Sequence, residues 1–69
     1  MIDLAQQIGH AIRSCRVEQK ISQEKLALLC NIDRSYLGRI ERGEVNPTLE
    51  KIYELSKSLC IDIKDLLPK

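Results

Sequence analysis

The most constraining feature of this 69-residue sequence is a gap of about three residues between two short predicted helices. Ser22 is a favourable N-cap for a helix over about 23–30. Asn31 follows at the position where helices commonly end in a left-handed residue, a conformation that asparagine tolerates. Asp33 then caps the next helix, which extends to about Arg42. A connection this short restricts how the two helices can be placed relative to each other.

Helix-capping and helix-ending residues also divide the rest of the chain, and together they predict an all-α fold with five helices. The first spans about 3–18, and Gly43 closes the helix that follows Asp33. Thr48 caps a fourth helix, and Asp62 caps a last turn or two over 63–67. Apolar residues at three- and four-residue intervals predict the buried faces: Leu4, Ile8, Ala11, Ile12, Cys15, Leu26, Ala27, Leu29, Cys30, Leu37, Ile40, Leu49, Ile52, Leu55 and Leu59.

Length and composition indicate one compact globular domain over residues 1–69. The chain is 43% hydrophobic and 30% charged, and no apolar run approaches the ~18 residues of a membrane span. Cys15, Cys30 and Cys60 are odd in number and far apart, and His10 is the single histidine, so we expect neither a zinc site nor a disulfide framework. We therefore expect a cytoplasmic protein with reduced thiols, no cofactor and no enzymatic activity.

The charge of the chain is nearly balanced, so its distribution is more informative than its sum. The formal net charge is +1 and the pI about 7.7, below the pI of about 9 that indicates nucleic-acid binding from composition alone. Residues 1–42 carry seven Lys and Arg against five Asp and Glu, whereas residues 43–69 carry four against five. This mild asymmetry favours the N-terminal half as the surface that meets an anion.

Two helices joined so tightly are typical of a helix-turn-helix unit, here about 22–42, whose second helix can enter the major groove of DNA. Four segments carry a wider pattern: ISQEKLA (21–27), SYLGRIERG (35–43), NPTLEKIYELSKSL (46–59) and IDIKDLL (61–67). With them the chain resembles the Xre family, the lambda-repressor and Cro-like helix-turn-helix domains, over nearly its whole length. It departs from the family at Cys60, where members often have glycine, and at Lys25, where Glu or Gln would complete a capping box.

The resemblance implies a compact five-helix DNA-binding domain that regulates transcription. Such a regulator would bind double-stranded DNA as a homodimer on a palindromic operator, with no membrane and no small-molecule effector. The DRSYL run and the short length look most like the small controller proteins of restriction-modification systems. Short phage or plasmid repressors look similar, and related domains also act as antitoxins or protein-docking modules, which is the alternative function.

The start of the second helix of the unit carries the residues predicted to contact bases. Arg34, Ser35, Tyr36 and Arg39 lie in its first turns, the part that meets base edges in this motif. Arginine can donate two parallel hydrogen bonds to guanine, whereas a serine hydroxyl is less selective. For Tyr36 we favour a phosphate or thymine-methyl contact over core packing. The alternative for both arginines is an ordinary solvated surface.

Four further residues are predicted to contact phosphates. Gln23 begins the first helix of the unit, where free N–H groups bind anions, and the family uses the matching position in this way. Arg42 and Asn46 flank Gly43 at the far end of the next helix. Arg13 is a lesser candidate, and an ordinary solvated position is the alternative for it.

The remaining candidates concern stability and assembly. By its place in the family pattern, Arg16 matches an arginine that pairs with the acid at Glu41, with phosphate contact as the alternative role. The C-terminal segment has more apolar residues than one short helix can bury beneath itself, which predicts a dimer surface. Its members are Ile61, Ile63, Leu66 and Leu67, with Tyr53 as a possible addition.

Overall fold

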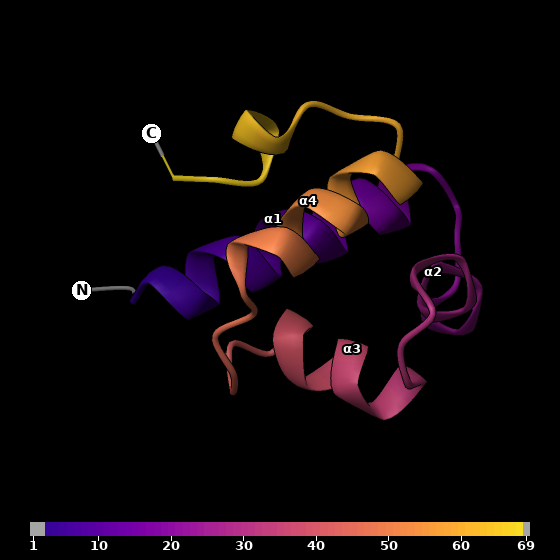
Figure 1. Cartoon of the computed structure of the whole chain (residues 1–69), viewed down its shortest axis with the longest axis horizontal. Coiled ribbons are helices and arrows are strands. Elements are labelled where there is room, and N and C mark those ends of the chain that lie inside the picture. Colours follow the sequence, from indigo (N-terminus) through magenta and orange to yellow (C-terminus); the bar gives the residue numbers. More distant parts are fainter. Residues whose placement is uncertain (1–2, 69) are drawn as a thin grey trace.

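The computed structural model describes residues 3–68, which form four α-helices followed by one turn of 3-10 helix (Figure 1). The elements are α1 (Leu4–Glu18), α2 (Gln23–Cys30), α3 (Arg34–Glu41), α4 (Leu49–Ser58) and η1 (Ile63–Asp65). Helix α3 packs against α1 and α2, α2 also contacts α4, and η1 packs on α4. Within the described residues there is no strand, and no helix is both long enough and apolar enough to span a membrane.

The prediction of a fifth α-helix was wrong. The residues after Asp62 make only i to i+3 hydrogen bonds, such as Leu66 N–H to the Ile63 carbonyl oxygen at 2.9 Å. Pro68 follows almost at once, so the segment has too few residues for further hydrogen bonds to offset the unfavourable free energy of nucleating an α-helix. The segment therefore stays a single tight turn.

Side-chain caps begin three of the four α-helices, and those of Ser22 and Thr48 are where the sequence predicts them. Asp3 accepts from Gln6 N–H, Ser22 from Lys25 N–H and Thr48 from Lys51 N–H, at 2.8 to 3.1 Å. Asp62 caps η1 in the same way. Asp33 differs: it has the extended backbone of an N-cap, but its side chain makes no capping hydrogen bond.

All four α-helices end in the same backbone motif, in which a residue with positive φ reverses the chain. These residues are Lys20, Asn31, Gly43 and Cys60, with φ of 60°, 56°, 76° and 58°. The next residue then donates its N–H back to the helix, as Ile21 does to Arg16 O at 3.1 Å and Glu44 to Arg39 O at 2.9 Å. Cys60 therefore has a Cβ in a left-handed conformation, which costs about 1 kcal/mol relative to glycine.

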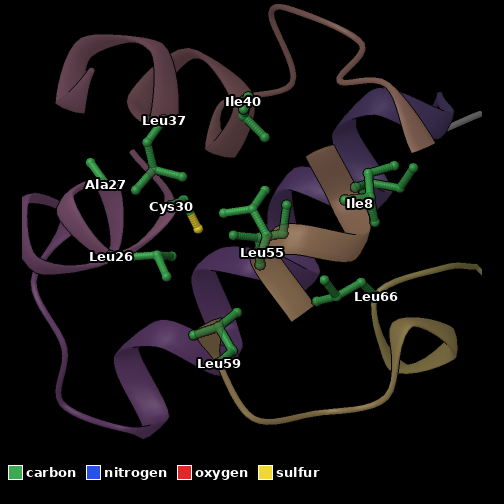
Figure 2. Close-up of a cluster of buried hydrophobic side chains, with 11 residues drawn as sticks. Ile8, Leu26, Ala27, Cys30, Leu37, Ile40, Leu55, Leu59 and Leu66 are labelled. Carbon is green, nitrogen blue, oxygen red and sulfur yellow. The ribbon is translucent and has the colours of Figure 1, made fainter. Parts of the chain in front are cut away.

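The core lies between the helices and is closed by the C-terminal segment (Figure 2). Ile12, Leu26, Leu37, Ile40, Leu55 and Leu59 are completely buried. Three residues expected in the buried faces are instead exposed: Leu4 (58%), Leu29 (50%) and Leu49 (66%). Leu4 and Leu49 are the first residues of their helices, beyond the main packing contacts, and Leu29 lies off the face of α2 that Leu26 and Cys30 define.

Candidate nucleic-acid interface

The exposed face of α3 carries three of the four side chains predicted to contact bases. Arg34, Ser35 and Arg39 are exposed. On the opposite face Leu37 and Ile40 are 0% exposed and hold the helix against the core. Since the helix is fixed by this packing, the polar side chains project from a rigid support whose first turns can reach base edges in a major groove.

Three other residues predicted to contact DNA differ in their burial and in the element that carries them. Tyr36 is half-buried and packs against the hydrophobic core, so only part of its ring is accessible. Asn46 is exposed in the loop between α3 and α4. Arg13 is exposed on α1. The structure therefore gathers Arg34, Ser35 and Arg39 on one helix face and leaves Arg13 on a separate helix.

A buried ion pair joins α1 to the end of α3. Arg16 Nε donates to Glu41 Oε2 at 2.7 Å and Arg16 Nη2 donates to Glu41 Oε1 at 3.0 Å. The side chains are only 11% and 2% exposed. Arg16 Nη1 also donates to the carbonyl oxygen of Ile21 at 2.8 Å, which fixes the turn before α2. This is the geometry of the structural role expected for Arg16, and it directs the guanidinium into the fold.

Gln23 belongs to the same network. Its Nε2 donates to Glu41 Oε1 at 2.9 Å, so Glu41 accepts from two elements at once. One amide hydrogen of Gln23 is thereby committed within the protein, and the other hydrogen remains for a ligand at the start of α2. Glu41 thus orients the side chain that is predicted to contact a phosphate.

Arg42 is exposed at the end of α3 and is paired with Glu44. Arg42 Nε donates to Glu44 Oε2 at 2.6 Å, and the two side chains are 60% and 51% exposed. The hydrogen bond to Glu44 raises the pKa of Arg42 and lowers the pKa of Glu44, so both groups are charged at neutral pH. The guanidinium predicted to bind phosphate is therefore occupied by a carboxylate of its own chain.

Sequence reasoning missed two contacts that hold this surface in place. Gly9 lies in the middle of α1, where a Cβ would collide with the main-chain carbonyl oxygen of Ile40. Glycine is required there because the backbones of α1 and α3 approach so closely. Gln19 Nε2 donates to the carbonyl oxygen of Leu59 at 2.6 Å and ties α1 to the end of α4. A glycine inside a helical pattern was the available signal for the first contact, and no local signal indicated the second.

The predicted dimer surface is smaller than the sequence indicated. Leu66 is 1% exposed and belongs to the core, because the chain after α4 folds back over that helix. Ile61, Ile63 and Leu67 are half-buried and keep part of their apolar surface accessible. Tyr53 is 51% exposed on α4, with Lys57 Nζ 5.5 Å from the centre of its ring.

The fold and this surface are those of a helix-turn-helix protein. Two short helices are joined by three residues, and the second helix has a polar exposed face that carries arginines. Residues 12–66 match the helix-turn-helix family HTH_3, and the chain belongs to this family. Members of the family are DNA-binding regulators of transcription rather than enzymes.

Within the family the chain is similar to restriction-modification controller proteins. Control protein C.BamHI of Bacillus amyloliquefaciens is 43% identical over 60 residues, which cover 86% of this chain and 74% of the relative. The crystal structure of the controller protein C.AhdI from Aeromonas hydrophila has a TM-score of 0.88 at 38% identity, covering 91% of this chain and 96% of that one. The controller protein C.Esp1396I has been solved as a tetramer in complex with its natural 35 base-pair operator. It has a TM-score of 0.82 at 28% identity, covering 96% and 97% of the two chains.

Proposed function

We propose that the protein is a sequence-specific, double-stranded DNA-binding regulator of transcription, of the restriction-modification controller type. The observation that carries the proposal is the exposed face of α3, where Arg34, Ser35 and Arg39 project from a helix fixed by buried Leu37 and Ile40. The similarity to C.Esp1396I, which is known in complex with its operator, supports the same role.

In this proposal α3 enters the major groove, and the side chains of the interface act in two ways. Arg34 and Arg39 donate to guanine O6 and N7, each good bidentate contact discriminating by about 1–3 kcal/mol. Gln23, Arg42 and Asn46 contact phosphates on either side of the groove, with Arg13 as a peripheral contact. Phosphate contacts position the helix but carry no base preference, so specificity comes from α3.

A homodimer is the proposed working unit, because one short recognition helix buries too little surface for useful specificity. Two-fold pairing through Ile61, Ile63 and Leu67, extended by Tyr53, would cover apolar surface left accessible in the monomer. It would also present two α3 helices to half-sites about 34 Å apart on a palindromic operator. The chain would act in the cytoplasm, and its concentration would control occupancy of the operator.

Selection of bound duplexes from a random DNA pool tests this function directly. The proposal predicts enrichment of one palindromic sequence with half-sites centred about 10 base pairs apart. An enriched pool without any shared sequence would contradict sequence-specific binding.

An apolar groove favours protein docking as the second candidate function. Its apolar lining includes Leu4, Ile8, Val45, Leu49, Ile52 and Leu67, and Asp3, Glu44 and Asn46 also line it. Docking in this groove would depend little on salt, whereas DNA binding weakens steeply as salt rises because bound counterions are released. The salt dependence of binding to any captured partner therefore separates the two functions.

A further inference from the structure

Glu44 breaks a pattern that the other three helix ends keep. The position compared is the residue directly after the positive-φ residue at the end of each α-helix. At all four ends this residue donates its N–H back to the helix. At three ends it is an isoleucine packed against the core, namely Ile21, Ile32 and Ile61. An apolar contact commonly accompanies this motif. After α3, the proposed recognition helix, the residue is Glu44, and such departures from a local rule tend to mark functional positions.

The backbone holds Glu44 beside the charged end of α3. Its N–H donates to the carbonyl oxygen of Arg39 at 2.9 Å, and its carboxylate accepts from Arg42 Nε at 2.6 Å and from Arg42 Nη2 at 3.5 Å. The hydrogen bond from Arg42 holds the pKa of Glu44 below its usual value, and the charges of Arg42 and Arg39 act in the same direction. Glu44 is therefore ionised at neutral pH and faces two arginines proposed to contact DNA.

A carboxylate and a phosphate bind to the same donors of a guanidinium, since each offers two oxygens to its parallel N–H groups. We infer that Glu44 is an affinity-setting residue, whose carboxylate occupies Arg42 in the free protein and competes with a DNA phosphate for it. This inference rests on the proposed function. Because both side chains are about half exposed, the pair is weak enough for a phosphate to displace. Glu44 thus lowers affinity for DNA without preventing binding.

The competition predicts a gain of affinity when the carboxylate is neutralised. Glu44→Gln should bind both a selected duplex and random DNA about two- to fivefold more tightly, because an exposed ion pair no longer has to be broken. The slope of log affinity against log salt should steepen by up to about one, since no carboxylate is left to take up a cation. Glu18→Gln is the matched control: it makes the same charge change at an exposed position at the end of α1. It should bind as the wild type does.

A second pair of variants assigns the gain to Arg42. In the Arg42→Ala background, Glu44→Gln should raise the affinity for DNA by at most a small part of the gain seen in the wild type. That small gain would come from Arg39. Equal affinities for Glu44→Gln and Glu18→Gln, or weaker binding by Glu44→Gln, would overturn the inference while leaving DNA binding by the wild type intact. A full gain in the Arg42→Ala background would overturn it as well. Failure of the wild type to bind any duplex would instead refute the proposed function, and the inference with it.

Discussion

Glu41 is a carboxylate held almost entirely out of water, with its side chain 2% exposed. Its charge is tolerated because Arg16 and Gln23 together donate three hydrogen bonds to its two oxygens. Removal of one partner from such a pair leaves the other charge buried without compensation. The network therefore acts mainly on the stability of the fold. It affects DNA binding only by orienting Gln23.

Glu41→Ala should accordingly lower the free energy of unfolding by about 3 kcal/mol, because Arg16 would remain buried without its partner. Thermal unfolding followed by circular dichroism measures the loss. Glu18→Ala removes an acid from an exposed position and should melt within a few degrees of the wild type. Normal melting of Glu41→Ala, combined with poor DNA binding, would instead place Arg16 on the DNA surface.

Arg34 occupies the first position of α3 and is exposed. Arg34→Ala should weaken binding to the selected duplex by about 1–3 kcal/mol and relax the preference at one base pair in each half-site. Arg42→Ala should weaken all sequences about equally, because phosphates carry no base information. Competition assays with single-base variants of the duplex distinguish these outcomes, and equal losses on selected and random DNA would refute base contact by Arg34.

At the scale of helices, α1 and α3 approach each other closely at Gly9. Gly9→Ala should destabilise the protein by about 2 kcal/mol or more, because the added Cβ meets backbone that can move only if the helices separate. Gly38→Ala is the matched control within α3. Its Cβ would lie 3.2 Å from the flexible end of Arg42, and alanine favours helix, so its stability should be unchanged or slightly higher. Equal melting temperatures for the two variants would contradict the close approach.

The helices themselves could be predicted because caps and helix ends are local. Ser22, Thr48 and Asn31 act within a few residues of their own positions, so sequence spacing alone located α2 and the start of α4. The burial of Leu66 depends on the path of the chain after α4, and the requirement for Gly9 depends on a backbone about thirty residues away. Neither is encoded in local periodicity. The pairing of Arg42 with Glu44 was missed for a related reason, since each residue is unremarkable until the turn at Gly43 brings them together.

At the scale of the whole molecule, the proposed dimer makes stability depend on concentration. Ile63→Glu should give monomers that keep their helices but lose most of their operator affinity, and the melting temperature should no longer rise with protein concentration. Leu67→Glu should act in the same direction. Val17→Glu, at an apolar position 52% exposed on α1, is the control and should still dimerise.

Sedimentation at micromolar concentration measures the dimer directly. A wild type that is monomeric both alone and on DNA would exclude the dimer and favour the docking function.

The central claim is that the exposed face of α3 confers sequence-specific binding to double-stranded DNA. Fluorescence anisotropy titrations of the wild type, with the selected duplex and a scrambled duplex of equal length, test it at several salt concentrations. We expect the selected duplex to bind at least ~10³-fold more tightly near physiological salt, and both affinities to fall steeply as salt rises. Equal dissociation constants for the two duplexes, or an affinity that does not respond to salt, would contradict the claim.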